Sequence, residues 1–228
     1  MHGPANKTGA SDIDTRQQFI TQFVDETAQK KGHGEHSLPS WRDHILATDA
    51  ATKAETPWLK LAKFGTKRTA KNCLRHDANV TAVTGIECDY DDETISFEDA
   101  VEIMRKANVR CLLYTSASHT PEAPHWRILV PFSKDYPPAS RAPMVGRVNG
   151  LFNGSLAPES FVLSTSYHYG SVANNPHHQA VVLDGGFLDL NDRLHAGSID
   201  KQGHRLGHKD FEQSKSTSER TREPGNPF

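Results

Sequence analysis

The chain has 228 residues, of which 36% are hydrophobic and 24% charged, and this composition supports one good-sized core but not two independent ones. The formal net charge of −2, counted with thirteen neutral histidines, excludes a strongly basic surface, so nucleic-acid binding would need local patches. The three cysteines form no C-x-x-C pair, which argues against a disulfide framework or a zinc ribbon. No apolar run approaches about 18 residues and no signal-peptide pattern opens the chain. We therefore expect a soluble, cytoplasmic protein that has no membrane partner.

The composition also divides the chain into three parts. Residues 1–15 are small and polar, and residues 196–228 are rich in charged residues, Ser, Gly and Pro. Both ends carry too few apolar residues to offset the entropy lost on ordering, so we predict that they are disordered. The segment 16–195 is predicted to form a single folded domain.

The first half of this domain is predicted to begin with helices. Apolar residues fall at helical spacing within residues 14–30, and a second helical stretch is expected over residues 40–51. An apolar strand then runs from Val80 into an acidic string that begins at Glu87. The following helix is capped by Ser96, and Asn108 is expected to stop it.

The second half alternates strands and one helix. Residues 109–115 and 126–132 are predicted to form a β-hairpin, residues 144–152 a helix, and residues 161–169 and 179–183 two further strands. The order strand, helix, strand, strand, helix, strand predicts an α+β fold with an RRM-like (split βαβ) sheet packed on helices, behind an N-terminal helical layer. Such a sheet also forms the palm of several polymerases, although a fold alone does not determine function.

The acidic string is the first candidate site. Alternate residues of a strand share one face, so Glu87, Asp89 and Asp91 are expected on the same side. Paired carboxylates suit two divalent ions, Mg²⁺ or Mn²⁺, which phosphoryl transfer uses to activate the attacking hydroxyl and to stabilise the leaving group. The alternative is a solvated acidic turn, because D-x-D alone is a weak signal. Its place directly after an apolar strand favours the metal site.

A second polar cluster follows one helix and one strand later. Ser116, Ser118 and His119 lie in the loop of the predicted hairpin, and Arg127 lies on its returning strand. Hydroxyls, an imidazole and a guanidinium suit the triphosphate of a nucleotide, which an arginine can bind in bidentate fashion. The alternative is a polar hairpin loop in which the histidine only caps backbone groups.

A local basic stretch precedes the acidic strand, with Trp58 and Phe64 interleaved. It could follow the backbone of a nucleic-acid strand and stack a base, or it could be a solvated helix face. The chain contains no P-loop motif, so any helicase partner is expected to be a separate chain or a continuation of this one. The basic residues are Lys60, Lys63, Lys67, Arg68, Lys71 and Arg75.

Three segments together resemble the archaeo-eukaryotic primase superfamily, in particular its replication-protein and bifunctional primase-polymerase branch in bacteria, plasmids and phages. They are Gly85–Asp91, Tyr114–Thr120 and His125–Pro131, and weaker likeness extends the resemblance to about residues 40–195. The resemblance implies that Asp89 and Asp91 bind the metal ions and that His119 holds the incoming nucleotide. It also implies that residues 16–195 are a catalytic domain for template-directed nucleotidyl transfer, with single-stranded DNA and nucleoside triphosphates as partners.

The chain departs from the family pattern at one position. Family members place a third metal-binding carboxylate where this sequence has Ala157. Glu159 or Glu87 could replace it, and without either the metal site would lack a ligand. A replication-initiation or DNA-binding module without catalysis is therefore the main alternative, and a D-x-D metal-dependent glycosyltransferase is a weaker one.

Overall fold

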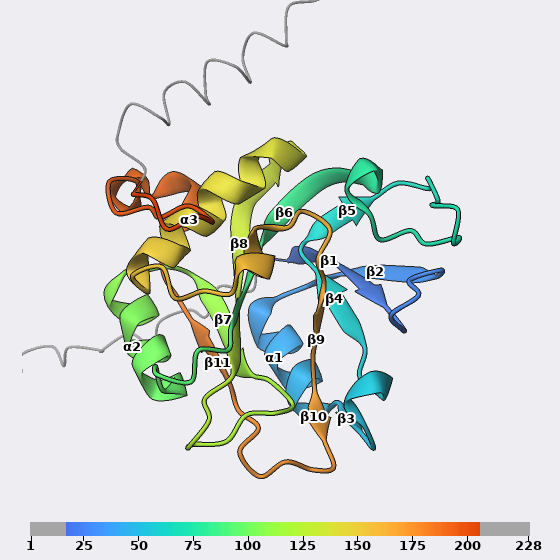
Figure 1. Ribbon diagram of the computed structural model, residues 1–228, viewed down its shortest axis with the longest axis horizontal. Helices are drawn as coiled ribbons and strands as arrows, with labels where there is room; N and C mark the ends of the chain where they lie inside the picture. The colour runs from blue at the N-terminus through green and yellow to red at the C-terminus, as the bar shows by residue number, and fades with distance from the viewer. Residues whose placement is uncertain (1–16, 206–228) are drawn as a thin grey trace, which may run out of the picture.

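The computed structural model describes residues 17–205 (Figure 1). Residues 1–15 and 206–228, which belong to the predicted disordered ends, lie outside the described residues. The remainder of the predicted tail, residues 196–205, is described. There Ile199 is buried, and its amide donates to the carbonyl of Gly146 at 3.0 Å. The boundary proposed at residue 195 remains a prediction. In the described part of the chain no helix has the length and apolar character needed to cross a membrane.

A five-stranded antiparallel sheet forms the centre of the fold, in the order β11-β7-β8-β6-β5. The hairpin that the sequence predicts is present as β7 and β8. Helix α2 connects β6 to β7, and β8 lies between these two strands in the sheet. The five strands are β5 (Ala62–Phe64), β6 (Val80–Tyr90), β7 (Cys111–Thr115), β8 (Trp126–Tyr136) and β11 (Ala180–Leu183).

The RRM-like arrangement is incomplete at the edges of this sheet. In an RRM-like sheet the fourth strand lies beside the first, whereas here β11 pairs with β7, the second strand of the unit. The edge beside β6 is occupied by β5, which comes earlier in the chain. Pairing with β5 closes the edge that the fourth strand would otherwise use.

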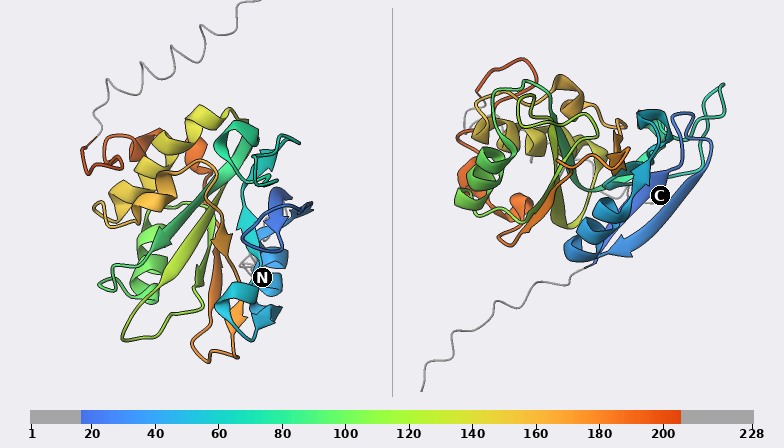
Figure 2. Two further views of the ribbon diagram at one scale, coloured as in Figure 1. Left: turned by 45° about the vertical axis from the view of Figure 1, so that its right-hand side comes forward. Right: turned by 90° about the horizontal axis from the view of Figure 1, so that it is seen from below.

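Two helices cover one face of the sheet (Figure 2). They are α2 (Phe97–Lys106) and α3 (Arg141–Leu151), both predicted from the sequence. The Ser96 hydroxyl caps α2 by accepting from the amide of Asp99 at 3.0 Å, and Asn108 ends the segment with a positive φ of 52°.

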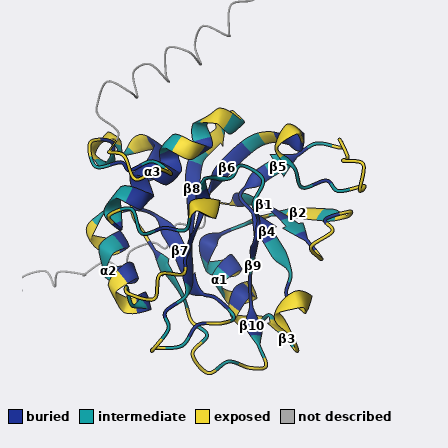
Figure 3. Cartoon of the chain, viewed as in Figure 1, coloured by how far each residue is buried: buried dark blue, intermediate teal, exposed yellow. Residues whose placement is uncertain are grey.

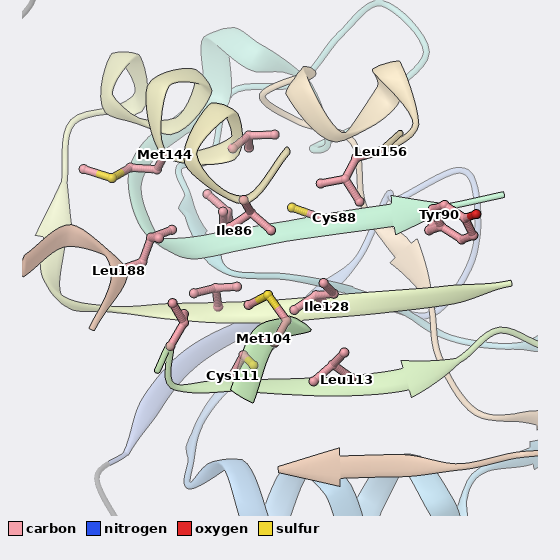
Figure 4. Packing of buried hydrophobic residues seen from close by; sticks show 14 of the residues in the cluster. Ile86, Cys88, Tyr90, Met104, Cys111, Leu113, Ile128, Met144, Leu156 and Leu188 are labelled. Atoms are coloured by element: carbon pink, nitrogen blue, oxygen red, sulfur yellow. The ribbon is translucent and has the colours of Figure 1, made fainter. Parts of the chain in front are cut away.

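The alternation of β6 decides which side chains enter this core (Figure 4). Ile86, Cys88 and Tyr90 point toward the helices and are fully buried among apolar residues. The intervening residues, Glu87 and Asp89, therefore belong to the opposite face.

That opposite face packs against a second layer, which contains α1 (Leu38–Ala47) and a four-stranded sheet (Figure 2). The sheet order is β2-β1-β4-β9, from Lys31–His36, Gln18–Phe23, Trp58–Lys60 and Tyr167–His168. A short parallel pair, β3 (Asp49–Ala50) and β10 (Ser171–Val172), lies beside it. Of the strand predicted over residues 161–169, only β9 forms. Residues Pro158–Phe161 make a 3-10 turn, η4.

The predicted N-terminal helical layer is wrong in its first element. The segment predicted as a helix over residues 14–30 forms strand β1, which pairs with β2 as a hairpin. Ile20 and Phe23 are buried, but they belong to two different apolar clusters, and Val24 is 71% exposed. The second predicted helix is present as α1.

Candidate functional site

Asp89 and Arg127 form a buried ion pair at the end of the long strands. The two residues are cross-strand partners on β6 and β8, and Arg127 Nε donates to Asp89 Oδ1 at 2.7 Å. Arg127 also donates from Nη1 to the carbonyl of His168 on β9 at 2.8 Å, and its guanidinium lies 5.3 Å from the ring centre of Tyr167. The arginine thus joins the central sheet to the second layer at this point.

Asp91 follows the end of β6 and is more accessible, since its side chain is 55% exposed. His125 Nδ1 lies 2.9 Å from Asp91 Oδ1, and His125 Nε2 lies 3.1 Å from a carboxylate oxygen of Glu93. Burial raises the pKa of Asp89 and the nearby Asp91 carboxylate raises it further, while Arg127 opposes both effects. The structure therefore brings the two predicted acids together.

Glu87 is occupied by a different set of contacts. It is completely buried, accepts from Lys60 Nζ at 2.7 Å and from Arg141 Nη2 at 2.9 Å, and also accepts from the amide of Leu61. Burial alone would raise the pKa of Glu87, but the two cations outweigh it and lower that pKa. The carboxylate is fully used within the core, which contradicts the suggestion that Glu87 completes a metal site.

The segment that carries Glu159 lies directly beside Asp89. The amide of Ala157 donates to the carbonyl of Asp89 at 2.9 Å, and the amide of Asp89 donates to Ser160 Oγ at 3.0 Å. Glu159 itself is exposed on η4. Within residues 17–205 no cluster of three or more His, Cys, Asp or Glu side chains is placed to hold a metal ion. Carboxylate oxygens such as those of Asp89 and Asp91 are the hard donors that Mg²⁺ and Mn²⁺ prefer.

His119 is buried in the loop between β7 and β8. Its Nδ1 accepts from the amide of His125 at 3.1 Å, and its ring meets that of Phe97 edge-on at 6.4 Å. Burial lowers the pKa of His119, so the ring is neutral near pH 7, and the proton lies on Nε2 because Nδ1 accepts. Nearby, Ser116 Oγ and Ser118 Oγ are 3.2 Å apart. His125 links this loop to Asp91.

The predicted basic stretch divides into buried and exposed residues. Lys60 is fully buried beside Glu87, so it does not belong to a nucleic-acid surface. Lys63 pairs with Asp135 at 2.6 Å. The loop between β5 and β6 projects from the edge of the molecule and is mostly exposed (Figure 3), and it carries Lys67, Arg68 and Lys71. Arg75 lies in the second half of this loop, and its guanidinium is over the ring of Trp58, 4.4 Å from its centre.

Sequence reasoning missed the residues of β9 that contact this site. Tyr167 is buried against Arg127, and His168 supplies the carbonyl that Arg127 binds. Arg141 on α3 was also missed, although it binds Glu87 and the carbonyl of Ser160. Tyr167 and His168 lie within the strand predicted over residues 161–169, but the sequence does not indicate what they contact, and only the pairing of β9 with β4 places them beside this site.

Comparisons with known proteins add one finding. No family model matches the sequence, and no curated protein matches it. Among solved structures, the AEP domain of the primase-polymerase of cyanophage S-2L matches with a TM-score of 0.43 and 13% sequence identity. The match covers 77% of this chain and 85% of that domain.

Proposed function

We propose that this protein is a nucleotidyltransferase of the primase-polymerase type, which adds nucleotides to a nucleic-acid strand under the direction of a single-stranded template. The observation that carries the proposal is the pairing of Asp89 and Asp91 at the end of β6. It combines with the sequence resemblance of three segments, all of which meet at this end of the sheet.

The proposed roles follow from the contacts. Asp89 and Asp91 would hold a Mg²⁺ or Mn²⁺ ion, which when bound supplies charge stabilisation to the reacting phosphate. His119, neutral and protonated on Nε2, is suited to donate a hydrogen bond to a phosphate oxygen of the nucleotide, with Ser116 and Ser118 beside it. Arg127 would not bind the triphosphate as the sequence suggested. Its ion pair with Asp89 suits it to hold that carboxylate in place.

A second candidate function is supported by the missing third carboxylate. Glu87 is bound by two cations and Glu159 is exposed. The site therefore offers two carboxylates, Asp89 and Asp91, instead of three. This favours a module that binds nucleotides or nucleic acid without transferring nucleotides. A glycosyltransferase is disfavoured, because such an enzyme uses a doubly wound nucleotide-binding domain and the central sheet here is antiparallel.

One assay separates the two candidates. The full chain is incubated with single-stranded DNA, with and without a primer, labelled ribo- or deoxynucleotides, and Mg²⁺ or Mn²⁺. Metal-dependent incorporation that Asp91→Ala abolishes supports the transferase. Binding of the same DNA without incorporation under any of these conditions supports the binding module.

A further inference from the structure

Beside the acidic pair, three side chains from distant parts of the chain form a stack. The rings of Trp58 and His168, cross-strand partners on β4 and β9, have centroids 3.6 Å apart and planes inclined at 39° to each other. The guanidinium of Arg75 lies 4.4 Å from the Trp58 ring centre. We refer to these three residues as the His168–Trp58–Arg75 stack. All three are partly exposed, so the stack reaches the surface.

The imidazole of His168 is held in one orientation. Its Nδ1 lies 2.6 Å from Thr56 Oγ1 and 3.2 Å from the Thr56 carbonyl. The Thr56 hydroxyl donates to the carbonyl of Lys53, so it can only accept from the imidazole, which places the ring proton on Nδ1. Burial, together with the cations Arg127, Lys53 and Arg75, lowers the pKa of His168 to about 4. The ring is therefore neutral near pH 7 and partly exposed, with the cations Lys53 and Arg75 nearby.

The charges around the stack favour an anionic ligand. Lys53 is exposed, and the loop between β5 and β6 adds the exposed Lys67 and Lys71. The loop sequence from Gly65 to His76 contains no acidic residue. The neighbouring acids are Asp25 and Glu26 near Arg75, Asp77 near the end of the loop, and Glu55 two residues after Lys53. The backbone carbonyl of Glu26 accepts from Arg75 Nη2 at 3.0 Å, and the Asp77 carboxylate accepts from the amide of Ser164. The chain as a whole is slightly acidic, so the run of four cations without an acid from Gly65 to His76 is a distinct feature.

We propose that the His168–Trp58–Arg75 stack, with Lys53 and the lysines of the adjoining loop, binds a nucleic acid as a single strand whose unpaired bases stack on these side chains. Bases stack on aromatic rings and on arginine planes only when they are unpaired, while lysines follow the phosphates. The carbonyl of His168 is bound by Arg127, which holds Asp89, so the bound strand would lie next to the acidic pair. This inference deepens the proposed function and rests on it only for the identity of the ligand as a nucleic acid.

The three tryptophans of the chain offer a direct readout. Trp41 and Trp126 are fully buried, whereas Trp58 is partly exposed. Titration of the wild-type chain with a single-stranded oligodeoxynucleotide of about 16 residues, without metal or nucleotide, should therefore quench tryptophan fluorescence. It should also protect Trp58 from a soluble quencher. A duplex of the same sequence should bind more weakly.

The variants Arg75→Ala and His168→Ala should each weaken this binding at least about fivefold, the effect of losing one stacked base. For Arg75→Ala, the dependence of log affinity on log salt should become shallower by about 0.7 for each phosphate that the arginine no longer neutralises. Lys106→Ala is the matched control, because it removes an exposed lysine from α2, on the other face of the central sheet. It should bind as the wild type does.

Two results would overturn the inference. One is unchanged affinity in both variants, with thermal unfolding midpoints that show they are folded. The other is that the wild type binds the oligonucleotide but the soluble quencher still reaches Trp58 as it does in the free protein, or that the wild type binds the duplex more tightly than the single strand. Because the titration contains neither metal nor nucleotide, failure of the transferase proposal leaves it unaffected. Conversely, if the protein incorporates nucleotides but Arg75→Ala and His168→Ala bind the oligonucleotide as the wild type does, the binding role of the stack is rejected and the transferase proposal stands.

Discussion

Arg127 Nε and Asp89 Oδ1 are 2.7 Å apart, and both residues are less than a tenth exposed. A divalent ion that binds Asp89 must therefore share this carboxylate with a guanidinium. The other carboxylate of the pair, Asp91, lies near Asp89 and contacts His125, but it has no buried cation partner and its side chain is more than half exposed. The two acids thus differ in what their removal would do to the fold.

Replacing the two aspartates should affect activity in the same way and stability differently. Asp91→Ala should abolish nucleotide incorporation and change the free energy of unfolding by less than about 1 kcal/mol, because the side chain is exposed. Asp89→Ala should also abolish incorporation, but it should cost about 3–5 kcal/mol of stability, because it leaves Arg127 buried without its partner. Urea unfolding and primer extension on both variants check this. Incorporation at the wild-type rate by Asp91→Ala would reject the proposed site.

The position of Ala157 offers a gain-of-function prediction. Its amide binds the carbonyl of Asp89, so a carboxylate introduced here starts from a backbone already adjacent to the acidic pair. We expect Ala157→Asp to bind Mn²⁺ at least about tenfold more tightly than the wild type, as measured by calorimetry, because a third hard oxygen ligand is added. If the chain is a transferase with an incomplete site, incorporation should rise as well.

Glu159→Gln is the matched control for this change. The residue is exposed on η4, two positions from Ala157, and we expect its loss to alter Mn²⁺ affinity less than about twofold. A large loss of affinity in Glu159→Gln would show instead that Glu159 reaches the ion when it is bound. Glu159 would then be the third metal-binding carboxylate, as the sequence suggested.

His119 should act on nucleotide binding. Since the neutral ring has its donor on Nε2, His119→Ala should raise KM for the nucleotide by about tenfold and leave kcat within a few-fold, as expected for a contact made equally in the ground and transition states. Steady-state kinetics at saturating template measure both constants. A large fall in kcat at unchanged KM would place His119 in the chemical step.

How far the sequence predicted this molecule can be seen from particular elements. Helix α2 was predictable because its signals are local: a serine cap, an apolar face and an asparagine that ends it. Strand β1 was not, because its apolar spacing is compatible with a helix and only pairing with β2 and β4 fixes it as a strand. Tertiary context overrides local preference in such segments.

The same division holds for the candidate site. The neighbouring placement of Asp89 and Asp91 follows from strand alternation, and their proximity could be predicted. The partners of Glu87 could not, because Arg141 is 54 positions away in the sequence and Lys60 looks like any lysine of a basic stretch. Only packing of β4, β6 and α3 around one carboxylate shows that this lysine is buried.

The buried Lys60 should make stability depend on pH above neutrality. Burial and the nearby Arg141 lower the pKa of Lys60 to about 7, and Glu87 offsets this only in part. An unfolded lysine titrates at about 10.4, so between these values the unfolded chain holds a proton that the folded chain has lost. The free energy of unfolding therefore gains a contribution that rises with pH from about 7 to about 10.4, by at most about 1.4 kcal/mol per pH unit, and is flat below pH 7.

The variant Lys60→Met removes this contribution, and Glu87 keeps Arg141 as a buried partner. The buried thiol of Cys88 acts in the opposite direction. Burial raises its pKa to about 12, so as pH rises the thiol ionises first in the unfolded chain, which lowers the free energy of unfolding. Because Lys60 itself lowers the pKa of Cys88, the difference between wild type and variant reports the titration of the lysine together with its influence on this thiol. Urea unfolding at pH 7, 8, 9 and 10 should show that the free energy of unfolding of the wild type increases relative to that of Lys60→Met as pH rises. The control Lys106→Met, which removes an exposed lysine, should show the same pH dependence as the wild type. Parallel curves for wild type and Lys60→Met would mean that Lys60 keeps its proton throughout and is stabilised as a cation by Glu87.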